Sequence, residues 1–191
     1  KMATFAESNT DLRLPFFGWS TTAEAYQSVN PAAIVLLAPL IGILFTRRAG
    51  KFPSTIMKFV IAVLIVGLSA LMLGYGFQIW PGGQDLSPWW FLALVYVIQT
   101  VAELFLTPVG LATTTALAPR SFASQAMGLW WLSVAAGQGV AGFVIAQTEH
   151  LSDATYYYGL GVATLLMALV LFAVAPWTQR QMADVETATA E

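Results

Sequence analysis

The sequence contains no cysteine, a single histidine and very little charge. Without cysteine the chain can form neither a disulfide nor a thiolate metal site. It shows no HExxH sequence, no paired intramembrane aspartates and no Ser–His arrangement, so an intramembrane enzyme is hard to build from these residues. The net charge is −2 and basic residues form no run interleaved with aromatic ones, which argues against nucleic acid as a partner. We therefore expect no enzyme, no metal, no cofactor and no nucleic-acid ligand.

The residues that are present are mostly apolar. Hydrophobic residues make up 58% of the chain and charged ones 9%, against about 25% charged in a soluble domain. A membrane-spanning helix needs about 20 apolar residues. The sequence therefore predicts an all-α, polytopic membrane helix bundle that crosses the lipid bilayer about five times. The predicted spans are residues 29–46, 56–79, 89–117, 121–147 and 156–175.

The segments outside these spans set the expected topology. Lys and Arg gather after the first span, at Arg47, Arg48, Lys51 and Lys58, which predicts that this loop is cytoplasmic. Residues 1–28 are then the end of a preceding helix and a loop outside the cytoplasm, and 177–191 a polar cytoplasmic tail. Five spans leave the two ends on opposite faces, so we expect the chain to be a piece of a longer protein that has lost a helix at its amino-terminal end.

Glu103 is the main functional candidate because it lies inside a hydrophobic span. An ionised side chain at the centre of a membrane helix costs about 2.5–3.5 kcal/mol, so such residues usually have a function. Helical spacing places it on one face of the span with other polar or small residues: Tyr96, Gln99, Thr107, Gly110 and Thr114. The alternative is a buried carboxyl that only fixes the packing of neighbouring helices.

Two prolines within spans are candidate hinges. Pro108 cannot donate a hydrogen bond to the carbonyl of Leu104, so the helix should bend one turn from Glu103. Pro39 adds a second expected bend in the first span.

The cluster Gln27–Pro31 (QSVNP) allows two interpretations. In the first, Asn30 caps a helix that has Pro31 at its first position. In the second, Gln27 and Asn30 project into a cavity near the outer end of the span and contribute to a binding site.

The segment MGLWWLS, residues 127–133, lies in the fourth span. Trp130 or Trp131 offers an aromatic wall to a cavity, or else faces lipid or a packing contact, and the two rings point about 100° apart. Further along, Ala135, Gly139, Gly142 and Ala146 form a ridge of small residues that should let another helix approach closely.

At these clusters the sequence resembles the C-terminal half of the proton-dependent oligopeptide transporters, the POT family, a branch of the major facilitator superfamily. The matching stretches are YQSVNPAAIVLLAPLIGILF (26–45), AELFLTPVGL and the LAP that follows it (102–119), and MGLWWLS (127–133). Their order and spacing both fit, and the resemblance covers about residues 3–176.

The resemblance implies a secondary transporter of the bacterial inner membrane that imports di- and tripeptides by proton symport and alternating access. Glu103 would bind the amino group of the peptide and couple it to protons, and Asn30 would help to hold that amino terminus. Thr107 stands where the family often has Ser, and Trp130 would form a wall of the side-chain pockets. The implied partners are a small peptide, protons and the N-terminal half of the same transporter.

The departures from the family matter for activity. The first six helices are absent, with their acidic–arginine motif and the basic residues expected to hold the peptide carboxylate. Alternating access needs two halves, so this chain alone is not expected to transport. Two alternatives stay open: a related transporter of another small solute, such as nitrate or an amino acid derivative, or a non-transporting membrane scaffold subunit in which Glu103 joins two helices.

Overall fold

The structure is a computed structural model, and it describes residues 2–13, 22–47 and 53–188. Its elements in chain order are α1 (Met2–Ser8), the 3₁₀ helix η1 (Ala23–Ser28), α2 (Val29–Arg47), α3 (Thr55–Ile79), α4 (Trp89–Leu117), the 3₁₀ helix η2 (Arg120–Phe122), α5 (Ala123–Gln147) and α6 (Asp153–Ala188). Five helices in the described part are long and apolar enough to cross a membrane. The predicted fold class, an all-α membrane bundle, is confirmed.

The helices begin and end close to the predicted limits, with one large difference. The sequence places the end of the last span at Pro176, whereas α6 continues to Ala188. Pro176 removes one backbone donor, but the polar segment after it can continue the helix outside the hydrocarbon region. Parts of two predicted segments, the loop at 14–21 and the basic residues Arg48 and Lys51, lie outside the described residues.

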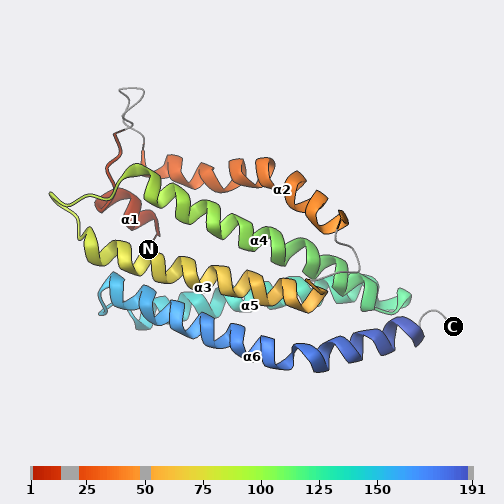
Figure 1. The fold of residues 1–191 in the computed structure, drawn as a ribbon. Coiled ribbons are helices and arrows are strands. Elements are labelled where there is room, and N and C mark those ends of the chain that lie inside the picture. Colours follow the sequence, from red (N-terminus) through yellow and green to blue (C-terminus); the bar gives the residue numbers. More distant parts are fainter. Residues whose placement is uncertain (1, 14–21, 48–52, 189–191) are drawn as a thin grey trace.

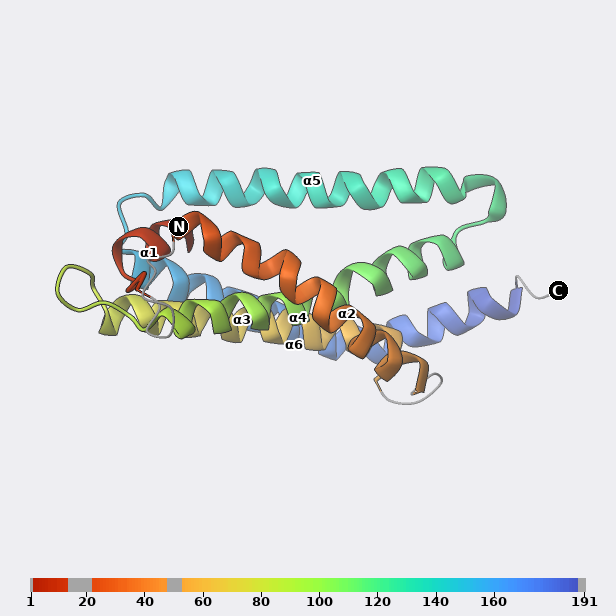
Figure 2. The ribbon, with the colours of Figure 1, turned by 90° about the horizontal axis from the view of Figure 1, so that it is seen from above.

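Helices α3 and α6 lie side by side along much of their length (Figures 1 and 2). Glycines make this close approach possible. A Cβ on Gly161 of α6 would lie 2.5 Å from Cδ2 of Leu71, and one on Gly67 of α3 would lie 2.9 Å from the side chain of Leu165. Small residues let helix backbones approach in lipid, where the hydrophobic effect does not drive helix association.

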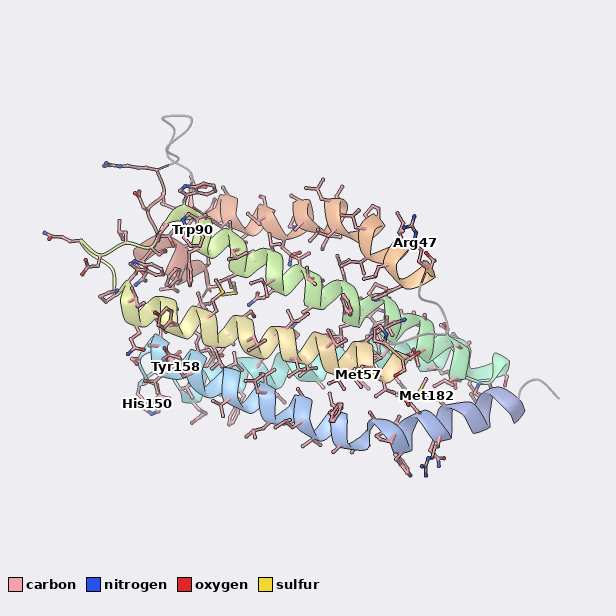
Figure 3. All side chains as sticks on the ribbon, in the orientation of Figure 1. Arg47, Met57, Trp90, His150, Tyr158 and Met182 are labelled. Atoms are coloured by element: carbon pink, nitrogen blue, oxygen red, sulfur yellow. The ribbon has the colours of Figure 1, made fainter. Side chains whose placement is uncertain are left out.

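A hydrophobic core fills one end of the bundle, where α1 and η1 meet α3, α4 and α6. Phe5 of α1 is fully buried and contacts the rings of Phe77 and Phe91. Tyr157 of α6 stacks on Phe77 at 5.5 Å between ring centroids. This end carries Trp90, His150 and Tyr158, whereas Arg47 and Met57 lie at the opposite end (Figure 3).

Polar contacts join the end of α1 to the loop between α3 and α4. The side-chain amide of Asn9 donates to the carbonyl of Trp80 at 2.8 Å, and the backbone N–H of Ser87 donates to the carbonyl of Asn9 at 2.7 Å. The loop turns at Gly82, which has a φ of +95° that other residues rarely adopt. These contacts hold α1 against the end of the bundle that lies opposite Arg47.

The glycines of α6 give a direct test of this packing. We expect Gly161→Leu to lower the free energy of unfolding by about 1–3 kcal/mol, because the new side chain would collide with Leu71. Gly159→Leu, two residues away on the same helix, is the matched control, since a Cβ there meets nothing within 4 Å. Thermal melting in detergent measures both. Equal melting temperatures for the two variants would contradict the α3–α6 contact.

Candidate functional site

Helices α2 and α4 bring together two residues that the sequence singled out separately. The side-chain amide of Asn30 donates a hydrogen bond to Oε2 of Glu103 at 3.3 Å, across 73 positions of the chain. Asn30 lies near the start of α2, and Glu103 lies in the middle of α4. The contact therefore places a carboxylate and a carboxamide at one point between two membrane-spanning helices.

Asn30 is not a helix cap. Helix η1 runs directly into α2, and the two together form one span, Ala23–Arg47, so Asn30 lies inside a continuous helical segment. The capping interpretation is therefore wrong, since the preceding 3₁₀ turn already starts the helix. The side chain is free to reach α4 instead. Its Oδ1 atom is buried and has no hydrogen-bond partner among the described residues.

Glu103 is an exposed residue in this chain, although it lies in the middle of a membrane-spanning helix. In the structure it has an open side beyond Asn30. The site can therefore receive a further group.

The polar stripe predicted on α4 does not face a single space. Gln99 donates to Oγ of Ser69 on α3 at 3.3 Å, and Tyr96 packs against the hydrophobic core. Only the later part of the stripe, from Glu103 to Gly110, turns away from α3 toward α2 and α5.

The ring of Trp130 lies against the same face of α4. A Cβ placed on Gly110 would lie 2.0 Å from Cη2 of Trp130, so the indole occupies the space where a side chain would begin. Trp130 is half-buried, whereas Trp131 is 56% exposed, and so only one of the two tryptophans contacts α4 in this way. Thr107, also half-buried, lies between Glu103 and Gly110 along the helix.

Gln27 lines a different space from Asn30 and Glu103. It contributes to a pocket of about 550 Å³ between α1 and η1, together with Glu7, Thr22 and Glu24. The structure therefore separates Gln27 from Asn30, which the sequence grouped together. In the described residues no group of three or more His, Cys, Asp or Glu is placed to hold a metal ion.

Both candidate hinge prolines lie inside continuous helices, Pro39 in α2 and Pro108 in α4, and both are exposed. The C-terminal part of α4 turns away from α3 toward α5 (Figure 2). Further contacts join α2 to its neighbours. Phe45 meets Phe105 edge to face at 5.0 Å between centroids, and Nζ of Lys58 lies 4.4 Å from the centroid of the Phe45 ring.

Helix α5 has no buried residue in this chain and lies along one side of the bundle, where it contacts α4 (Figure 2). The ridge of small residues predicted to pack closely does not do so among the described residues. Gly139 and Gly142 each have open space where a Cβ would stand. The ridge is therefore available to a partner outside this chain.

Sequence reasoning missed the specific role of Gly110 and the aromatic pair Phe45–Phe105. Gly110 was recognised only as a member of the polar stripe, because spacing along one helix does not reveal which residue of another helix lies above it. The sequence did contain a signal for this contact. Gly110 shares a helical face with Glu103, and the next helix carries two adjacent tryptophans, Trp130 and Trp131.

Comparison with known proteins identifies the family. Residues 2–160 match the family model described as PTR2, POT family. The chain belongs to the POT family. It is 31% identical over 185 residues to the uncharacterized transporter YclF of Bacillus subtilis, covering 96% of this chain and 37% of that protein. It is 29% identical over 191 residues to dipeptide and tripeptide permease B of Edwardsiella piscicida, covering 93% and 38%.

Solved structures agree with this assignment. The crystal structure of a POT family transporter in complex with a thioalcohol-conjugated peptide matches with a TM-score of 0.81 and 31% sequence identity, over 92% of this chain and 36% of that one. The chain thus spans somewhat more than a third of the length of the relatives it matches. These relatives are transporters and not enzymes, and the chain is part of an integral, multi-pass protein of the bacterial inner membrane.

The exposure of Glu103 predicts how the protein tolerates its replacement. We expect Glu103→Gln to change the free energy of unfolding by less than about 1 kcal/mol, because the amide keeps an acceptor for Asn30 and no enclosing contact is lost. Thermal melting of the detergent-solubilised POT protein measures this, with Gly161→Leu as a destabilised reference. A fall as large as that of the reference would support a purely structural carboxyl.

Proposed function

We propose that this chain is the C-terminal half of a transporter that imports di- and tripeptides by proton symport. Membership of the POT family and the likeness to a dipeptide and tripeptide permease support a peptide substrate. The N-terminal half of the same protein would supply the rest of the site. The two halves would then alternate between outward- and inward-facing states around a site near the middle of the membrane.

The observation that carries this proposal is the contact between Asn30 and Glu103. A peptide ammonium group has three N–H donors and needs acceptors on several sides. The carboxylate of Glu103 supplies a charged acceptor, and Oδ1 of Asn30, which has no partner among the described residues, supplies a neutral one. The amino terminus of a peptide would bind between them, with Thr107 and Trp130 along the path of the rest of the molecule. Gln27 would line the outer approach.

The same carboxylate gives a physical route to proton coupling. An ionised Glu103 attracts the ammonium group, whereas a protonated one has lost the charge that holds it. A proton and a peptide amino group therefore compete for the same oxygen atoms. Symport follows if the proton that the peptide displaces from Glu103 passes to another group of the full-length protein, and if the conformational change is easy only when both are bound or neither is.

The exposed helices support a partner half. Besides the open small-residue ridge, α5 carries large apolar side chains that are about two-thirds exposed, such as Leu129 and Phe143. Lipid would cover the apolar side chains, but small residues on a membrane helix favour another helix. We propose that the N-terminal half packs on α5 and α2, and that Pro108 and Pro39 act as hinges when the two halves move.

Uptake by the full-length protein tests the function. In proteoliposomes with an inward proton gradient, wild type should concentrate labelled dialanine. Glu103→Gln should bind dialanine more weakly, because it lacks the charge. At saturating dialanine it should exchange the peptide across the membrane but fail to concentrate it, because the amide cannot take up and release the proton. Accumulation is measured with and without the gradient.

Glu149→Gln is the matched control, since it makes the same chemical change at an exposed position in the loop between α5 and α6. It should accumulate dialanine as wild type does. If wild type moves no di- or tripeptide under any gradient, the peptide assignment is wrong and another small solute must be sought. If Glu103→Gln concentrates dialanine normally, the coupling role of Glu103 is excluded.

A further inference from the structure

We propose that Gly110 is a specificity-determining residue, because its lack of a side chain fixes the position of the Trp130 ring beside the peptide site. The inference rests on the proposed function, since it concerns which peptides that site accepts. Gly110 itself need not touch the peptide. It acts by positioning Trp130.

The contact is close and is made by the whole far edge of the indole. A Cβ on Gly110 would lie 2.0 Å from Cη2, 2.6 Å from Cζ3 and 2.7 Å from Cζ2 of Trp130. Ordinary van der Waals contact begins at 3.4 Å, so any other residue at position 110 would displace the ring. The glycines of α5 differ from Gly110. A Cβ added to any of them would meet no atom within 4 Å: Gly128, Gly137, Gly139 and Gly142. Close contact between α4 and α5 is therefore made at Gly110 and not at these glycines of α5.

A displaced ring would move without disturbing either helix. The three crowded atoms are at the end of the side chain, and two side-chain torsions of Trp130 separate them from the backbone of α5. Alanine at position 110 would therefore push the indole away from α4 at small cost in stability. The displaced indole would then narrow the space beside α4 at the level of residue 110.

The spacing along α4 relates this position to the peptide. Gly110 is seven residues from Glu103, so the two lie on nearly the same face of the helix, two turns and about 10.5 Å apart. An extended peptide advances about 3.3–3.6 Å per residue. The third residue of a peptide held at Glu103 by its amino group lies about 7 Å along this face. Its side chain, or a long side chain on the second residue, would cover the remaining distance to Trp130.

The test compares peptides that differ only in side-chain size at these positions. Unlabelled Ala-Ala, Ala-Phe, Ala-Ala-Ala and Ala-Ala-Phe compete with labelled dialanine for uptake by the full-length protein in proteoliposomes. We expect Gly110→Ala to weaken competition by at least one of the two Phe-bearing peptides about tenfold relative to its Ala counterpart, the order of effect that pocket shape produces. Competition by Ala-Ala itself should change less than about twofold.

A second variant ties the effect to the indole. Trp130→Phe removes the far edge of the ring, so Gly110→Ala should change the peptide preference little when Trp130→Phe is already present. The double variant also keeps the test valid if Gly110→Ala alone folds poorly, because it lacks the crowded atoms. Gly42→Ala on α2 is the control, since a Cβ there meets nothing within 4 Å.

The outcomes separate this inference from the function on which it rests. If Gly110→Ala weakens all four peptides equally, or the double variant differs in preference from Trp130→Phe alone, the inference is overturned and the peptide function stands. If wild type takes up no peptide, the proposed function fails and the inference with it. A selective loss of Phe-bearing peptides that disappears in the Trp130→Phe background supports the inference.

Discussion

A carboxylate in the middle of a membrane-spanning helix is the constraint around which this half-bundle is arranged. Its cost in hydrocarbon, about 2.5–3.5 kcal/mol when ionised, requires a polar partner or access to water. Glu103 has the first, because Asn30 of α2 donates a hydrogen bond to it. Its remaining surface is exposed in this chain, which spans little more than a third of its relatives' length. That opening is what the rest of the structure has to maintain. Helices α3 and α6 pack together behind α4. Helices α2 and α5 each contact α4 on the side that carries Glu103.

Glycine is used in two different ways in this arrangement. At Gly67 and Gly161 it lets α3 and α6 pack closely along their length. At Gly110 it admits a single aromatic ring onto the helix that carries the acid. The first use stabilises the fold, and the second shapes the space beside the carboxylate. Both depend on a missing side chain, and the identity of the neighbour determines which use applies.

The fold was largely predictable from the sequence, because runs of about 20 apolar residues have few alternatives to spanning helices. The pairing of Asn30 with Glu103 was not, since periodicity within one helix says nothing about its neighbours. The cap interpretation of Asn30 failed because the 3₁₀ turn before α2 extends the helix upstream. The helix that was predicted to end at Pro176 continues to Ala188, because a proline can bend a helix without stopping it. A peptide substrate is indicated only by resemblance, because a carboxylate and a carboxamide can bind any amine.

The most direct test of the site is a double-mutant cycle on dialanine binding to the full-length protein, with Asn30→Ala, Glu103→Gln and the two combined. The Asn30–Glu103 contact predicts that the two residues bind one ammonium group as a unit. The loss of binding free energy in the double variant should then be well below the sum of the losses in the two single variants. Additive losses would contradict the account, because they would mean that Asn30 and Glu103 act on the peptide independently or not at the same point.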